Sequence, residues 1–138
     1  MTDDPVLVLV DIDHRDGGLA LLREVARQAA GAVLHVAYVI PFGFYSYVEP
    51  YVSEESQAEA AARAKVELED LIAEAGLAAT PHVLRGGIGE QALLLAEALK
   101  ARLMIVNATR QDSAHTTLGT HAAQIARHAP CSVLLVRA

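Results

Sequence analysis

Three nearly continuous apolar runs constrain the fold of this chain more than any other feature of its sequence. They are "VLVLVD" (Val6–Asp11), "RLMIVN" (Arg102–Asn107) and "CSVLLVR" (Cys131–Arg137). A strand with one solvated face alternates apolar and polar residues, whereas a strand buried on both faces is apolar throughout. Parallel sheets bury both faces, because their crossover helices cover them. The three runs therefore predict strands of a parallel sheet.

Two further strands and four helical patterns complete an alternating order. The additional strand candidates are "AVLHVAYV" (Ala32–Val39) and "PHVLR" (Pro81–Arg85). Apolar residues between the five runs recur at the spacing of one helix face, over residues 19–29, 53–72, 92–99 and 122–129. Strict alternation predicts an α/β fold, a five-stranded parallel doubly wound sheet of Rossmann-like type with helices on both faces. No linker or repeat is visible, so residues 1–138 are expected to form a single domain.

The amino-acid composition disfavours some classes of binding partner. The formal charge is −6, from 11 basic and 17 acidic residues, which disfavours nucleic-acid binding. No apolar run approaches the roughly 18 residues that cross a bilayer, and the first residues are acidic where a signal peptide is basic. One cysteine, Cys131, allows no internal disulfide. We expect a cytoplasmic protein without a membrane or nucleic-acid partner.

Ligands of such sheets bind beyond the carboxyl ends of the strands, so the segments there are the candidate site. Asp11 ends the first strand, and its carboxylate either accepts hydrogen bonds from a nucleoside or makes a turn before the first helix. The glycines of "RGGIGE" (Arg85–Glu90) favour a plain strand-to-helix turn over a phosphate contact. The loop "NATRQDSAHTTLGT" (Asn107–Thr120) enters the last helix, whose first N–H groups suit an anion. An ordinary helix cap at Thr120 is the alternative there.

Catalytic and metal chemistry find little support in the sequence. Three histidines are expected near the carboxyl edge, without a familiar ligand spacing: His14, His115 and His121. Ser113 and its acidic and histidine neighbours lack a nucleophile elbow. We therefore predict no catalytic residue and no metal ligand.

Five of the six aromatic residues lie in one segment, "IPFGFYSYVEPYV" (Ile40–Val52). Such a cluster folds back over the core as a lid, contacts another subunit or an apolar ligand, or packs its own side chains. The sequence leaves these alternatives open.

The whole chain resembles the universal stress protein family. The similarity rests on the opening "VLVLVDID", the strand "VLHV", the turn "RGG", and above all on the closing "LGTHAAQIARHAPCSVLLVR", in which Ser132 replaces the family's usual proline. The resemblance implies an adenine nucleotide alpha hydrolase-like sheet of five parallel strands. It also implies a homodimer in which the last strand, residues 131–137, pairs across the dimer axis.

The resemblance also implies where a nucleotide would bind. Family members that bind ATP or a related nucleotide carry G-x2-G-x9-G-[S/T] after the fourth strand, and other members bind none. Asp11 matches the aspartate that contacts the nucleoside, and Val36 and Val106 match apolar residues beside the adenine. Gly119 and Thr120 match the closing pair that holds phosphate.

The first two glycines of that motif are absent. Asn107 most naturally takes the first place and Arg110 the second, which leaves the interval to Gly119 one residue short. Aligned without a gap, Val106 and Thr109 take those places instead. Asparagine tolerates left-handed backbone better than most residues. An arginine there either swings away or places its guanidinium on a phosphate.

Three hypotheses for function follow. The first is a regulatory or stress-response dimer that binds ATP or AMP weakly or in an altered way, without turnover. The second is a dimeric interaction module that uses the aromatic segment 40–52 and no nucleotide. The third is a slow nucleotide hydrolase, which rests on analogy with related α/β folds alone.

Overall fold

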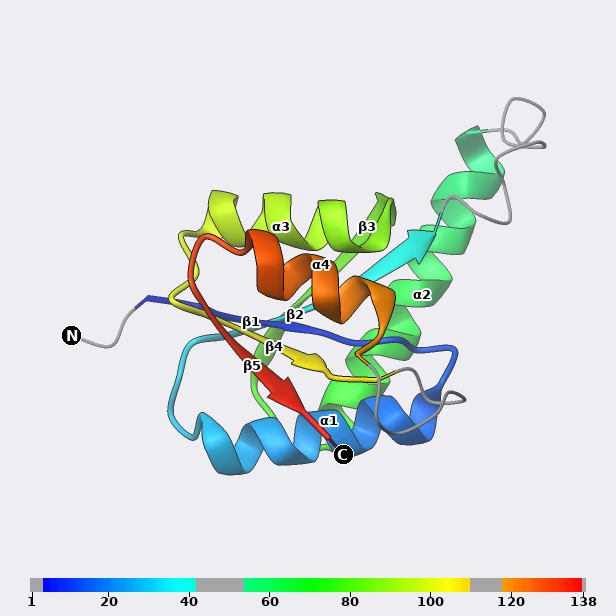
Figure 1. Ribbon diagram of the computed structural model, residues 1–138. Helices are drawn as coiled ribbons and strands as arrows, with labels where there is room; N and C mark the ends of the chain where they lie inside the picture. Colours follow the sequence, from blue (N-terminus) through cyan, green and yellow to red (C-terminus); the bar gives the residue numbers. More distant parts are fainter. Residues whose placement is uncertain (1–3, 42–53, 110–117, 138) are drawn as a thin grey trace.

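The fold is a five-stranded parallel sheet with helices on both faces, as the sequence predicts (Figure 1). This computed structural model describes residues 4–41, 54–109 and 118–137. The strand order is β3-β2-β1-β4-β5, with every neighbouring pair parallel. The strands are β1 (Val6–Leu9), β2 (Leu34–Pro41), β3 (Ala79–Gly86), β4 (Leu103–Asn107) and β5 (Ser132–Val136).

Strand β1 is buried on both of its faces. Val6, Leu7 and Val8 are each 0% exposed. Successive side chains of a strand point to opposite faces, and here Val6 and Val8 join one core cluster while Leu7 joins the other. The apolar run at the start of the sequence therefore reflects a central strand that two layers of helices must cover.

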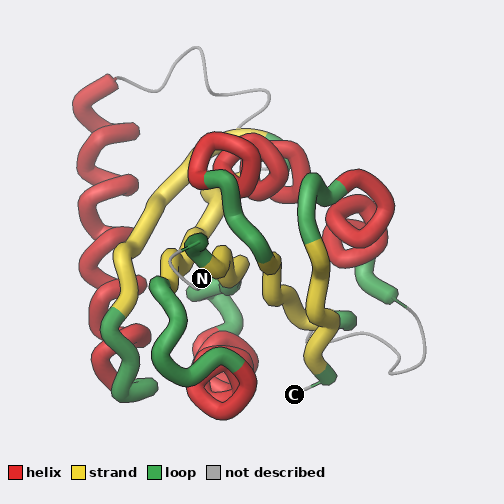
Figure 2. The backbone as a smooth tube through the Cα atoms, turned by 90° about the vertical axis from the view of Figure 1, so that its left-hand side faces the viewer, coloured by secondary structure: helices red, strands yellow, loops and turns green. Residues whose placement is uncertain are grey.

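The four helices divide equally between the two faces (Figure 2). Helices α1 (Arg15–Gln28) and α2 (Glu54–Glu74) supply Leu21, Leu22, Leu68 and Leu71, among others, to the first cluster. Helices α3 (Ile88–Leu99) and α4 (Thr120–His128) supply Ala92, Ala96, Ala122 and Ile125 to the second cluster. The small alanines of α3 let that helix lie close to the sheet.

All five strands differ in their bounds from the expected ones, β4 by a single residue at its start and β5 by a single residue at each end. Strand β2 starts at Leu34 and reaches Pro41, and β3 spans Ala79–Gly86, because the two pair residue by residue from Leu34↔Ala79 to Pro41↔Gly86. Strand β1 ends at Leu9, although the Val10 N–H still donates to the carbonyl oxygen of Ala37 at 2.9 Å. Hydropathy within one segment does not reveal how far a partner strand extends.

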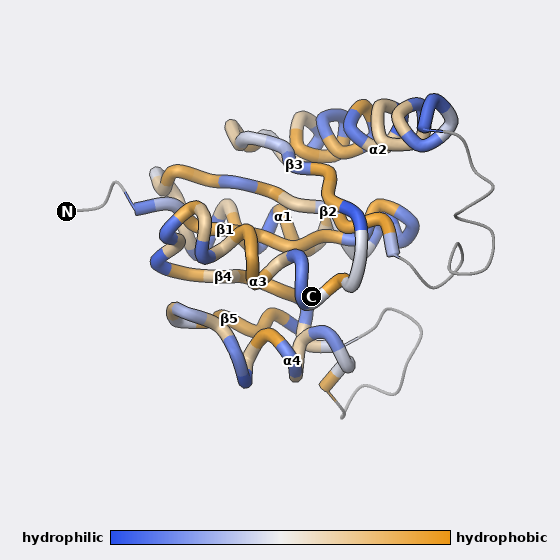
Figure 3. Tube along the Cα trace, turned by 90° about the horizontal axis from the view of Figure 1, so that it is seen from above, coloured by the Kyte–Doolittle hydropathy of each residue, from blue (hydrophilic) through white to orange (hydrophobic). Residues whose placement is uncertain are grey.

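The hydropathy of each segment matches its place in the layers of the fold (Figure 3). The central strands are apolar, and α2 alternates apolar residues toward the sheet with charged residues on its outer side. Within the described ranges, no helix is both long and apolar enough to cross a membrane. Most of the aromatic segment, residues 42–52, lies outside the described residues, so its alternatives stay predictions.

Helix α2 allows a matched test of the core. Leu68 is 0% exposed, whereas Val66 on the same helix is 57% exposed. Truncation of a buried leucine removes apolar contacts and leaves a cavity, so Leu68→Ala should lower the free energy of unfolding by about 2–5 kcal/mol. Val66→Ala should change it by less than about 0.5 kcal/mol. Urea unfolding measures both, and equal losses would show that α2 does not cover the sheet in this way.

Candidate functional site

A cavity of about 570 Å³ opens where the strand order reverses, between the carboxyl ends of β1 and β4. The chain proceeds outward from β1 through β2 to β3, then crosses to β4 and β5 on the other side. Crossovers that depart in opposite directions leave a crevice at that point. The described residues lining it come from both central strands, the β1–α1 turn, β2 and the starts of α1, α3 and α4: Leu9, Val10, Asp11, Asp13, His14, Gly17, Gly18, Tyr38, Val39, Pro41, Ile88, Val106, Asn107, Thr109, Gly119, His121 and Ala122.

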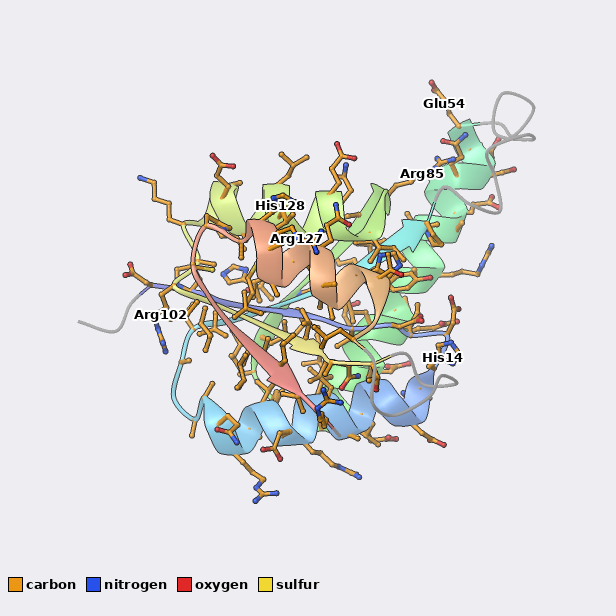
Figure 4. All side chains as sticks on the ribbon, viewed as in Figure 1. His14, Glu54, Arg85, Arg102, Arg127 and His128 are labelled. Atoms are coloured by element: carbon orange, nitrogen blue, oxygen red, sulfur yellow. The ribbon has the colours of Figure 1, made fainter. Side chains whose placement is uncertain are left out.

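Asp11 makes a turn and also faces the cavity. Its Oδ1 accepts a hydrogen bond from the Asp13 N–H at 2.9 Å, the local pattern that aspartate favours in turns. Its Oδ2 lies 3.7 Å from Nε2 of His14, which sits at the start of α1 on the side where the strand arrowheads point (Figure 4). The turn uses one carboxylate oxygen and leaves the other near the cavity. Both interpretations of this residue from the sequence are compatible with that geometry.

Gly18 allows helix α1 to approach this turn closely. A Cβ atom at Gly18 would lie 3.1 Å from Cδ2 of Leu71 and 3.4 Å from the carbonyl oxygen of Asp11. Any larger side chain would push α1 away from α2 and from the end of β1. The glycine therefore helps to fix the place of Asp11 at the cavity.

Tyr38 and Asp13 form a polar pair in the cavity wall. The Tyr38 hydroxyl donates to Oδ2 of Asp13 at 3.1 Å, and the tyrosine is only 7% exposed. Burial raises the pKa of the Tyr38 phenol, and the negative charge of Asp13, together with its hydrogen bond, raises it further. The phenol therefore stays protonated and holds the carboxylate in one orientation.

The carboxyl end of β4 supplies one apolar and one polar surface. Val106 is almost completely buried, and Oδ1 of Asn107 is buried without a hydrogen-bond partner among the described residues. An unpaired buried acceptor is costly. A donor group entering the cavity would satisfy this oxygen.

Helix α4 begins at the edge of the cavity. Gly119, at the N-cap position, has extended backbone, φ −65° and ψ 155°, and no side chain of the described residues caps the helix. Its N–H donates to the carbonyl oxygen of Ala108 at 2.8 Å, which ties the helix start to the end of β4. The first N–H groups of a helix have no partner within it and carry partial positive charge. The start of α4 is thus suited to an anion.

The sequence model of the universal stress protein family matches residues 4–137. This chain belongs to the universal stress protein family.

Solved structures with the same fold include several universal stress proteins. UspA from Lactobacillus plantarum superposes with a TM-score of 0.67 at 20% identity, over 96% of this chain and 97% of that one. A universal stress protein in complex with cAMP gives 0.65 at 21% identity, over 99% and 98%. The Archaeoglobus fulgidus universal stress protein in complex with dAMP gives 0.64 at 20% identity, over 99% and 100%. At these identities the likeness shows the fold.

Four of the residues matched to the family's nucleotide motif come together in this universal stress protein. Asp11, Val106, Asn107 and Gly119 all line the cavity. Thr120 is exposed and is not among the lining residues, although it begins α4. Arg110 lies outside the described residues, as do His115 and Ser113, so these predictions stay untested.

Val36 lies away from the cavity, in the middle of the sheet. It is 0% exposed and pairs with Val8 of β1. Strand β2 continues to Pro41, so its contribution to the cavity comes from Tyr38, Val39 and Pro41. Asp13 and Tyr38 lie in two segments that the sequence places at the carboxyl edge, "IDHRDGG" after the first strand and the segment from Tyr38 onward, but neither was predicted individually as a site residue. A tyrosine inside an apolar strand and a second aspartate after Asp11 were the available signals.

Other segments singled out in the sequence have structural roles. Gly86 has φ 137°, a backbone conformation that glycine adopts readily, and it turns the chain from β3 into α3. Neither it nor Gly87 lines the cavity, whereas Ile88 does. Across the described ranges, no group of three or more His, Cys, Asp or Glu residues is arranged to hold a metal ion.

The Tyr38–Asp13 pair predicts an effect at alkaline pH. Because the folded-state pKa of Tyr38 is raised, the unfolded chain loses this proton first, and stability falls as the pH rises above about 10. Because Tyr38 stays protonated in the folded protein at about pH 11, folded wild type and folded Tyr38→Phe should show the same phenolate absorbance. The alkaline loss of stability should be smaller in the variant. Extra phenolate in the wild type below its unfolding transition would contradict the burial and pairing of Tyr38.

Proposed function

We propose that this universal stress protein binds an adenine nucleotide, ATP or AMP, in the cavity between β1 and β4. The observation that carries the proposal is the convergence of Asp11, Val106, Asn107 and Gly119 on one cavity at the switch point. A volume of about 570 Å³ lies within the range of small-molecule sites. The complexes of similar proteins with cAMP and dAMP support the same ligand class.

Each part of the cavity suits one part of a nucleotide. Val106 and Val39 offer apolar surface for a base, while the carboxylates of Asp11 and Asp13 accept hydrogen bonds from hydroxyl or amino groups. The start of α4 at Gly119 suits a phosphate. The acceptor Oδ1 of Asn107 favours a donor rather than a phosphate oxygen beside it.

The charge around the cavity favours weak binding. Among the described lining residues there are two carboxylates, Asp11 and Asp13, and neither lysine nor arginine. A phosphate chain carries several negative charges and would gain attraction mainly from the start of α4. Arg110, which the motif alignment places in the second glycine position, would add a cation if its side chain turns inward. We infer modest affinity that depends on this arginine.

The cellular role that we propose is regulatory. Membership of the universal stress protein family supports a part in the stress response and a cytoplasmic location, with ligand binding rather than turnover as the output. Occupancy of the cavity would then report the nucleotide pool to a partner of the protein.

The nucleotide proposal is tested by calorimetry on nucleotide-free protein with ATP, AMP and cyclic AMP. We expect saturable binding with a Kd below about 1 mM for at least one of them. Asp11→Ala should weaken it about tenfold or more, a loss of about 1.4 kcal/mol. Asp16→Ala is the matched control, because Asp16 is an exposed acidic residue of α1 that does not line the cavity. Flat titrations with all three nucleotides would refute the proposal.

We further propose that β5 forms the interface of a homodimer. Strand β5 is an edge strand, paired with β4 alone in the described part of the chain, and Val133, Leu134 and Leu135 are only partly buried. An apolar edge strand with free backbone groups is a template for pairing with another chain. A second copy related by a two-fold axis would cover this edge with its own β5.

Light scattering coupled to size exclusion tests this interface. The wild type should show twice the 14.7 kDa mass of one chain. Leu134→Arg should shift it to the monomer mass, because a desolvated charge at the interface is costly. Leu94→Arg, at a leucine of α3 that is 53% exposed, should leave the mass unchanged. A monomeric wild type, or dissociation by both variants alike, would count against pairing through β5.

A further inference from the structure

Two histidines form a cluster outside the cavity, on the face of the sheet that α3 covers. His35 lies on β2 and His82 on the edge strand β3, and Nδ1 of His35 is 2.8 Å from Nε2 of His82. In the strand register His82 is opposite Ala37, two residues beyond His35. Ala37 and Leu84, which share this face by strand alternation, belong to the core cluster beneath α3 and α4. Nothing in the proposed nucleotide site uses this pair.

The two rings meet head-on. Their centroids are 5.0 Å apart, with planes inclined by 30°. That separation is nearly the largest that a 2.8 Å contact between the two nitrogens allows, so both nitrogens lie close to the line of centroids. Two lone pairs, or two N–H groups, would repel in this arrangement. The geometry therefore requires one N–H donor and one acceptor, with a single proton between the rings.

A shared metal ion would need a different geometry. Imidazoles that bind one zinc ion aim their lone pairs at a common third point, about 2.0–2.1 Å from each nitrogen. That arrangement brings the ring centroids closer together for the same distance between the nitrogens. The pair also has no third His, Cys, Asp or Glu grouped with it among the described residues.

Among the described residues, neither ring forms an ion pair with an acidic side chain. Leu7 of β1 lies opposite His35, and Leu84 follows His82 by two residues on the same face. Helix α3 turns its apolar residues toward the sheet, while its charged residues are exposed: Glu90, Glu97 and Lys100. Burial lowers the pKa of His82, and the positive charge of protonated His35 lowers it further. Protonation of both rings is therefore disfavoured while they stay in contact, since the gap between them would then hold two N–H groups.

We propose that the His35–His82 pair is a one-proton latch, which fastens the edge strand β3 to β2 while a single proton lies between the rings and opens when both rings are protonated. Strand β3 has one strand neighbour, β2, in the described sheet. The latch therefore acts at the side of the sheet where an added side-chain hydrogen bond matters most.

The direction of the pH dependence follows from the lowered pKa of His82. The open or unfolded chain takes up this proton near the ordinary histidine value of 6.5, before the closed pair does. The stabilisation by the latch is thus complete above pH 6.5 and declines as the pH falls below it. Acidification over the range in which free histidine titrates should loosen β3.

The direct test is a side-chain nitrogen NMR titration of the wild-type protein from about pH 8 to pH 5, the range around the ordinary histidine pKa. We expect complementary protonation of Nδ1 of His35 and Nε2 of His82 at the alkaline end, one donating and one accepting. The pair should then titrate in two separate steps, because the charge of one ring disfavours protonation of the other. Removal of an exposed histidine of α4, in His128→Gln (Figure 4), should leave both steps in place. Independent titration of both rings near 6.5 would overturn the latch.

Backbone hydrogen exchange tests what the latch holds. After correction for intrinsic rates, exchange of the β3 amides that bond to β2 should rise about tenfold between pH 7.5 and pH 5.5. The reason is that pH 5.5 lies about one unit below the ordinary histidine pKa, at which the open strand takes up the proton. The variant His35→Gln/His82→Gln should lose this rise. The same rise in the double variant would overturn the proposal. Saturable binding of zinc ion that both single variants abolish would do so as well, in favour of a metal site. If the double variant does not fold, the wild-type titration decides alone.

Discussion

The burial of β1 on both faces is the constraint on which the rest of the structure depends. Val6, Leu7 and Val8 have no solvent contact, so the chain must place a layer of helices on each side of them. With right-handed crossovers, α1 and α2 cover one face as the chain moves from β1 to β3, and α3 and α4 cover the other as it crosses from β3 to β4 and continues to β5. The reversal between β1 and β4 follows, and with it the cavity at their carboxyl ends. The proposed nucleotide site is thus a consequence of how this sheet is covered.

The sequence predicts the order of strands and helices because residues close together in the chain form each apolar run and each apolar helix face. The continuous run that contains Val6 could belong only to a strand covered twice, and α3 could be recognised from the spacing of Ala92, Leu95, Ala96 and Leu99. Strand ends were less predictable, since the extension of β2 to Pro41 depends on its pairing with Gly86 far along the chain.

The candidate site was predictable where the family motif and the topology agree. Asp11 follows β1 and Asn107 is the last residue of β4, two strands that the topology brings side by side, and both residues line the cavity. Val36 matches by motif alone, yet the longer β2 places it in the core and brings Tyr38 to the cavity instead. The Tyr38–Asp13 hydrogen bond joins residues 25 positions apart. Side-chain pairs of this kind, like His35 with His82, arise from strand register and cannot be seen in local patterns.

The polar groups that line the cavity differ in how firmly hydrogen bonds hold them. Asp13 is held by a tyrosine that stays protonated, Asp11 is partly committed to its own turn, and Asn107 keeps an unpaired acceptor. These acceptors suit ligands with hydroxyl and amino donors, and the buried Asn107 oxygen does so most, because an unmatched buried acceptor costs free energy. The start of α4 supplies the opposite preference, for an anion. A nucleoside carrying a phosphate has both kinds of group in one molecule.

The most direct measurement of the central claim is a map of backbone amide chemical shifts during titration with AMP. If the cavity between β1 and β4 binds the nucleotide, the largest changes should fall on Asp11, Asp13, Asn107 and Gly119, with β3 and the outer side of α2 unaffected. Changes confined to other parts of the molecule, or none at millimolar AMP, would contradict the account.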